Sequence, residues 1–114
     1  MVAEKIEDAL RQYYCTEQYW KNDMLCFQYT DGVKAMWTMC EAYWLLIAIS
    51  SYRRKESFQI WELKKTGPSS AVLTMKEDSD EPILVRQKIG YTDFPLDEIK
   101  LYLIDGVLIL PSEY

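Results

Sequence analysis

Carboxylates provide the strongest candidates for catalysis or metal binding in this chain. The run Glu77–Glu81 (EDSDE) offers oxygen ligands that Ca²⁺ and Mg²⁺ prefer, but it lacks the glycine and the distal glutamate of an EF-hand loop. Asp93, Asp97 and Glu98 form a second group that could pair for general acid–base catalysis. A solvated turn accounts for the first group, and favourable charge at a helix start accounts for the second. We therefore assign no catalytic residue, no metal ligand and no cofactor.

Histidine is absent from the chain, which removes Ser-His and Cys-His nucleophilic pairs and the commonest metal ligand. The three cysteines, Cys15, Cys26 and Cys40, are spaced too irregularly for a zinc site or a disulfide framework. We interpret them as small buried apolar residues in a reducing compartment. The charged N-terminal segment lacks the apolar stretch of a signal peptide. These features favour a non-enzymatic cytoplasmic protein.

The charge balance limits the classes of partner. With 13 basic and 18 acidic residues the net charge is −5, which argues against general nucleic-acid binding and against attraction to an anionic membrane. It leaves open a basic protein partner. Two basic clusters, at residues 53–55 and 64–65, have aromatic neighbours and keep a nucleic-acid-associated protein as the alternative.

Aromatic side chains gather where helical and strand periodicity are both weak. Tyr and Trp are enriched at binding hot spots, so we predict a partner-binding or self-association surface here. The competing interpretation is that the rings cover the core. The residues predicted to form this surface are Tyr13, Tyr14, Tyr19 and Trp20.

Helical periodicity predicts a short amphipathic helix at residues 3–14 and one long central helix. The central helix starts after Thr30-Asp31-Gly32, where Thr30 or Asp31 can cap it, and ends near the basic residues 53–55. Its uninterrupted apolar run, residues 43–49, is much shorter than the ~20 residues of a membrane span. We expect it to be covered by the protein's own sheet.

Alternation of apolar and polar residues predicts strands at 25–29, 58–65, 71–76 and 83–89, the last three forming an antiparallel meander. A helical turn is expected after Pro95. Asp105-Gly106 lies between two apolar runs, which predicts a C-terminal hairpin. The expected fold class is therefore α+β: a three-stranded meander plus a C-terminal hairpin, packed against one long central helix with a short N-terminal helix. Residues 1–114 are expected to form a single domain.

Several blocks of the sequence carry a family resemblance. TDFPLDEI (92–99) and LPSEY (110–114), with YTDG (29–32) and FQIWELK (58–64), resemble a family of small uncharacterised bacterial proteins, a domain of unknown function that also occurs in phage and plasmid genomes. The resemblance covers residues from about Ile6 to Tyr114. Members tend to carry a histidine after the early tyrosines, and this chain has none, so an activity resting on that histidine would be absent. The family implies no catalytic residue, and its mobile-element setting implies an accessory or anti-defence role, such as inhibition of a CRISPR complex.

The sequence therefore predicts a non-enzymatic, acidic protein-interaction module. Its expected partner is another protein or a second copy of the chain, reached through the aromatic cluster or through an edge strand of the sheet. A nucleic-acid-associated protein is the alternative, and an enzyme built on carboxylates alone is less favoured.

Overall fold

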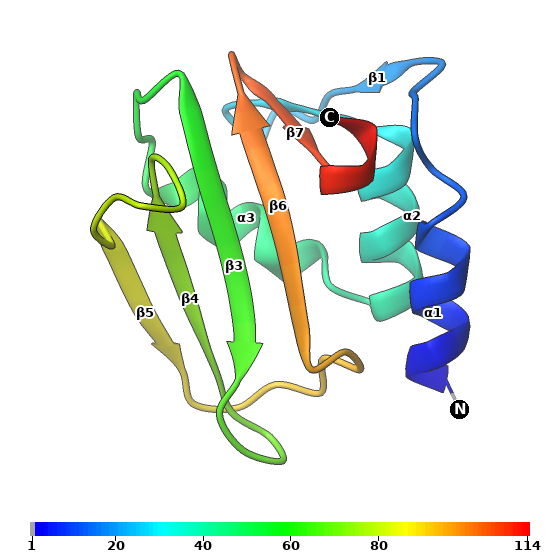
Figure 1. Ribbon diagram of the computed structural model, residues 1–114, viewed down its shortest axis with the longest axis vertical. Coiled ribbons are helices and arrows are strands. Elements are labelled where there is room, and N and C mark those ends of the chain that lie inside the picture. Colours follow the sequence, from blue (N-terminus) through cyan, green and yellow to red (C-terminus); the bar gives the residue numbers. More distant parts are fainter. Residues whose placement is uncertain (1) are drawn as a thin grey trace.

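The computed structural model describes residues 2–114, and a single seven-stranded sheet forms its largest element (Figure 1). The first residue of the predicted domain lies outside the described range. The strands are β1 (Tyr19–Trp20), β2 (Gln28–Thr30), β3 (Phe58–Lys65), β4 (Ala71–Lys76), β5 (Val85–Ile89), β6 (Glu98–Ile104) and β7 (Val107–Ile109). The helices are α1 (Val2–Leu10), α2 (Asp31–Cys40), α3 (Tyr43–Ser51) and the 3₁₀ helix η1 (Pro111–Glu113).

The strand order is β1-β2-β7-β6-β3-β4-β5, and every pairing is antiparallel except that of β2 with β7. The C-terminal hairpin forms as predicted between β6 and β7. Asp105 and Gly106 both have positive φ, 48° and 82°, which a two-residue hairpin turn of the I′ type requires. The hairpin delivers η1 and the C-terminal segment to the start of α2.

The predicted three-stranded meander with a separate hairpin is wrong, because both are parts of one larger sheet. β3, β4 and β5 are antiparallel neighbours, but β6 pairs along the other edge of β3 from Phe58↔Ile104 to Lys64↔Glu98, so all strands join one continuous sheet. The helical turn expected after Pro95 is also absent, because the segment stays irregular and leads directly into β6. Sequence periodicity does not show which edges of separate hairpins will meet.

The prediction of one long central helix is also wrong, because α2 and α3 are separate helices. Glu41 adopts a left-handed conformation, φ 52° and ψ 45°, and its backbone N–H bonds to the carbonyl of Trp37, which ends α2. Neither glycine nor proline marks the break. Each helix turns a different apolar face inward, and the Trp37 and Tyr43 rings pack edge to face across the junction with centroids 4.9 Å apart.

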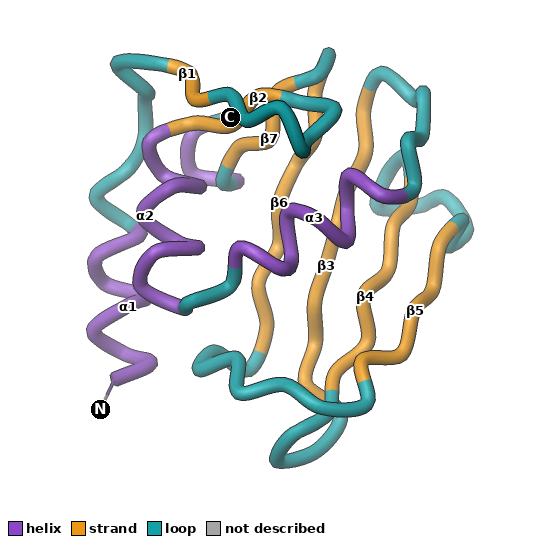
Figure 2. Tube along the Cα trace, turned by 180° about the vertical axis from the view of Figure 1, so that it is seen from behind, coloured by secondary structure: helices purple, strands orange, loops and turns teal. Residues whose placement is uncertain are grey.

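One face of the sheet is covered and the other is open. α3 lies across β6, β3 and β4 on the covered face, and α1 packs beside α2 (Figure 2). Leu45, Leu46 and Ile49 of α3 are buried with Trp61 and Leu101 of the sheet. The apolar run 43–49 is thus partly wrapped by the protein's own sheet, as expected, although Ile47 keeps 38% exposure. Within residues 2–114, no helix combines the length and the apolar character needed to cross a bilayer.

Candidate partner-binding groove

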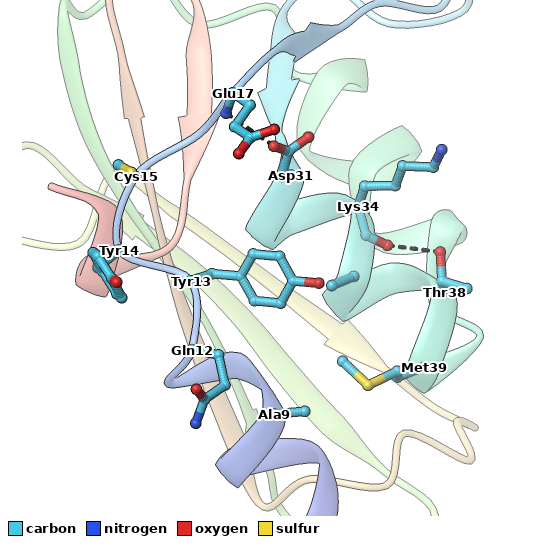
Figure 3. A pocket seen from close by; sticks show the side chains of 11 residues that line it. Ala9, Gln12, Tyr13, Tyr14, Cys15, Glu17, Asp31, Lys34, Thr38 and Met39 are labelled. Atoms are coloured by element: carbon cyan, nitrogen blue, oxygen red, sulfur yellow. Dashed lines mark hydrogen bonds between the residues drawn. The ribbon is translucent and has the colours of Figure 1, made fainter.

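A groove of about 840 Å³ lies between α1, the segment after it and α2 (Figure 3). Its floor is mostly apolar, and exposed polar groups stand along its upper part. The Tyr13 ring projects across the groove toward α2, whereas Tyr14 points away from that ring. The lining residues are Ala9, Gln12, Tyr13, Tyr14, Cys15, Glu17, Asp31, Lys34, Ala35, Thr38 and Met39.

The wall formed by residues 11–17 is fixed at both ends. Behind it, α1 packs on α2 with Ile6 and Leu10 buried in the core. At its start, the hydroxyl of Ser112 donates to the backbone carbonyl of Tyr13 at 2.6 Å, which ties the wall to the C-terminal segment. This segment lacks regular secondary structure, so these side-chain contacts hold it in place.

Asp31 fixes the other end of the wall. Its carboxylate accepts hydrogen bonds from the indole N–H of Trp20 at 2.9 Å and from the backbone N–H of Glu17 at 3.0 Å. These donors, Trp20 first, lower the pKa of Asp31 below its ordinary value. The ammonium of Lys34 lies 3.4 Å from the centroid of the Trp20 ring, which is cation–π geometry. The Asp31 carboxylate at the groove rim is therefore already engaged by hydrogen bonds within the domain.

The four predicted partner-binding aromatics do not share one surface. Tyr13 and Tyr14 line the groove, the first half-buried and the second 73% exposed. Trp20 turns toward α2, where Asp31 and Lys34 hold its ring. Tyr19, 59% exposed, lies on the opposite face of β1 and lines a separate depression near the C-terminal segment. The alternation of side chains along β1 separates the last two residues.

Glu113 is a site residue that sequence reasoning missed. Its carboxylate accepts from the hydroxyl of Thr30 at 2.6 Å and from the backbone N–H groups of Gly32 and Leu110 at 3.2 and 3.0 Å. A Cβ on Gly32 would lie 2.6 Å from Oε1 of Glu113, so glycine permits this close approach. The signal in the sequence was that YTDG and LPSEY stand out as distinctive blocks, and the fold brings them together.

The expectation that all three cysteines are buried is wrong for two of them. Cys40 is buried, and burial raises the pKa of its thiol to about 11. Cys15 and Cys26 are exposed free thiols, and Cys15 lines the groove.

The acidic groups weighed for chemistry are dispersed. Residues 77–81 are all exposed in the turn between β4 and β5, and Asp93, Asp97 and Glu98 are exposed around the start of β6. Within residues 2–114, no group of three or more His, Cys, Asp or Glu side chains is placed to hold a metal ion.

The fold and the groove define a mixed α+β domain with a concave helical side and an uncovered sheet face. Residues 4–114 match the family of unknown function DUF6876, and the chain belongs to that family. This agrees with the predicted membership of an uncharacterised domain family. No curated protein and no solved structure matches the chain.

Proposed function

We propose that this domain is a non-enzymatic interaction module that binds a segment of a basic protein in the groove between α1 and α2. The observation that carries the proposal is the combination of an apolar floor, an exposed Tyr14 and an acidic rim in one preformed concavity. Concave apolar sites with a few placed polar groups are the common form of binding pockets.

Charge favours a basic occupant. Residues 2–51, which build the helical side, contain seven acidic and four basic residues. Of the two acids that line the groove, Asp31 already accepts hydrogen bonds from Trp20 and Glu17. Within residues 2–114, the exposed Glu17 carboxylate forms no ion pair. The basic lining residue, Lys34, is held over Trp20. An incoming Lys or Arg would find Glu17 at the rim, and an adjacent apolar side chain would find Ala35 and Met39 below.

Cys15 allows the groove to be probed directly. A Cys26→Ser variant carries a single exposed thiol, which can be coupled to a benzophenone photo-cross-linker. A Cys15→Ser variant coupled at Cys26 is the matched control, because Cys26 does not line the groove. After illumination in lysate of the source cell, we expect one protein to attach from Cys15 and not from Cys26, through a peptide rich in Lys or Arg.

The captured protein is then purified and titrated against variants of the domain. Tyr14→Ala and Glu17→Lys should each weaken its binding by about tenfold, the scale of a hot-spot contact, whereas Asp23→Lys, outside the groove, should leave it unchanged. Equal cross-linking from both thiols, attachment to a second copy of the domain, or equal weakening by all three variants would each refute the proposal.

The proposal extends to the cellular role. Basic segments are characteristic of proteins that handle nucleic acid, so binding one fits an accessory or anti-defence role of mobile-element origin, such as inhibition of a CRISPR complex. The exposed thiols of Cys15 and Cys26 fit a reducing, cytoplasmic compartment.

A further inference from the structure

The open face of the sheet carries a second surface, whose charge is opposite to that of the chain as a whole. Strand register places its outward residues in rows that cross β5, β4, β3 and β6, which are neighbours in Figure 1. This face holds two acids, Glu62 and Glu98, in a chain of net charge −5. Its five cations are Lys64, Lys76, Arg86, Lys88 and Lys100.

Most of these cations are free to meet a ligand. Lys64 pairs with Glu62 at 3.6 Å, and Lys76 donates to the backbone carbonyl of Ser79 at 3.3 Å. Within residues 2–114, the side chains of Arg86, Lys88 and Lys100 form neither an ion pair nor a hydrogen bond, and all three are exposed. Arg86 and Lys88 lie on the same face of β5, about 6.4–6.8 Å apart along the strand. This separation is close to the repeat of phosphates in an extended nucleic-acid strand.

Aromatic rings occupy the other half of the same face. Tyr114 is 79% exposed as a residue, and its ring stacks on Phe58 with centroids 6.0 Å apart and an interplanar angle of 23°. Tyr102 meets the Tyr114 ring edge to face. Phe58 supports one side of the Tyr114 ring. Beside this ring lies a depression of about 460 Å³, whose lining includes Tyr19, Ile104, Val107 and Ile109.

We infer that the open sheet face binds single-stranded nucleic acid, with phosphates on the cationic rows and bases stacked at the Tyr114 end. Electrostatic grooves flanked by stacking aromatics are the general means of binding single strands without sequence preference. The acidic turn Glu77–Glu81 borders the upper end of β4 and β5 and would repel phosphates. We therefore place the nucleic-acid backbone along Arg86 and Lys88 of β5, with Lys100 on the far side of Glu62 in the same row. This inference does not rest on the proposed protein partner, although Cys15 lines both the groove and the depression beside Tyr114.

The charges on the edge strand β5 disfavour pairing with a second copy of the chain. Antiparallel pairing of two β5 strands about Gln87 would set Arg86 directly opposite Lys88 of the other copy. Like charges opposite each other in a strand pair are destabilising.

Fluorescence anisotropy with labelled oligo-dT and oligo-U of about 12 nucleotides, a length within the usual site size, tests the inference. The wild-type domain should bind at low salt, and its affinity should fall steeply as salt rises. Neutralising the face with Arg86→Gln, Lys88→Gln and Lys100→Gln should weaken binding by about tenfold or more, since phosphate contacts supply most of the affinity. The matched control, Lys5→Gln with Arg11→Gln and Lys21→Gln, removes the same charge from outside the face and should change affinity less than about threefold.

Tyr114→Ala should weaken binding by about fivefold or more, and Tyr114→Phe should retain it, because a stacked base needs the ring and not the hydroxyl. Circular dichroism establishes that each variant is folded. The inference is overturned if the wild-type domain does not bind at low salt, if the two triple variants behave alike, or if Tyr114→Ala binds as well as the wild type. Displacement of the oligonucleotide by poly-glutamate at equal charge would likewise overturn it and assign the face to acidic polypeptides.

Discussion

The hydroxyl of Thr30 donates to Oε1 of Glu113 at 2.6 Å, joining residues 83 positions apart in the chain. The same hydroxyl accepts from the backbone N–H of Val33, and the second Glu113 oxygen accepts from Gly32, so a long-range carboxylate completes the N-terminal cap of α2. α2 carries Asp31 and Lys34, which set the rim of the groove. The C-terminal segment therefore contributes to the geometry of a site formed largely by the first 40 residues.

Removing the Glu113 carboxylate should destabilise the domain. We expect Glu113→Ala to lower the free energy of unfolding by about 1–3 kcal/mol, because charge-assisted hydrogen bonds to three donors are lost. Gly32→Ala should also destabilise, by about 1–2 kcal/mol, although alanine is normally the better helix former, since its Cβ would meet Glu113 and Leu110. Urea unfolding of both variants and of the double variant should show a combined loss smaller than the sum. Strict additivity would mean that the two residues do not act on each other.

Local signals predicted the start of α2 but not its partner. Thr30 or Asp31 was expected to cap the helix from residue type and position, and Thr30 is the cap. Glu113 could not be predicted, because its role depends on the β6–β7 hairpin bringing residue 113 to residue 30. For the same reason the α+β class was predictable from periodicity, whereas the continuous sheet was not: the pairing of β3 with β6 joins segments that are distant in sequence.

Spacing in the sequence did not show which surface residues lie together. The clustering of Tyr13, Tyr14, Tyr19 and Trp20 in sequence suggested one site, but strand alternation and the Asp31 contact turn Tyr19 and Trp20 to different sides. The net charge concealed the cationic sheet face, because its cations come from four strands and meet only through register.

Trp20→Phe should raise the pKa of Asp31 toward its ordinary value, because the indole donor is the largest cause of the depression. A carboxylate with a depressed pKa stabilises the fold above the pKa of the unfolded state, and this contribution is lost as pH falls through the folded-state pKa. The stability difference between wild type and variant should therefore be present at neutral pH and shrink in acid. Carboxyl ¹³C NMR titration measures the Asp31 pKa directly. Tyr19→Phe, which keeps both donors, is the control, and an unchanged Asp31 pKa in Trp20→Phe would contradict the assignment.

Trp61→Ala should cost more stability than Trp44→Ala. Trp61 is 1% exposed and its indole N–H donates to the side chain of Gln59 at 2.8 Å, so truncation leaves both a cavity and a buried acceptor without its donor. We expect a loss of about 3–5 kcal/mol, the usual range for a buried Trp. Trp44 is half-buried and meets Phe94 edge to face, so its loss should be smaller. Chemical denaturation of the two variants gives the comparison, and the reverse order would place α3 rather than β3 at the centre of the core.

Alkylation should distinguish the three cysteines. Cys15 and Cys26 are exposed and should react with N-ethylmaleimide in the native protein, whereas Cys40 should react only after unfolding. With its pKa raised to about 11, Cys40 holds only about one thousandth of its thiol as thiolate at pH 8, and it is buried as well. Mass spectrometry after timed quenching counts the modified sites. Rapid modification of Cys40 in folded protein would show that α2 opens locally.

Glu41→Gly should stabilise the domain, which is the opposite of the usual effect of glycine within a helix. Glu41 is exposed and has φ 52°, a conformation that strains any side chain with a Cβ and that glycine adopts freely. We expect a gain of about 0.5–1 kcal/mol in the free energy of unfolding, measured by urea denaturation. Glu41→Ala is the matched control and should give no gain, because alanine keeps the Cβ. If residues 31–51 instead formed one continuous helix, Glu41→Gly would destabilise by about 1 kcal/mol, so the sign of the effect tests the break between α2 and α3.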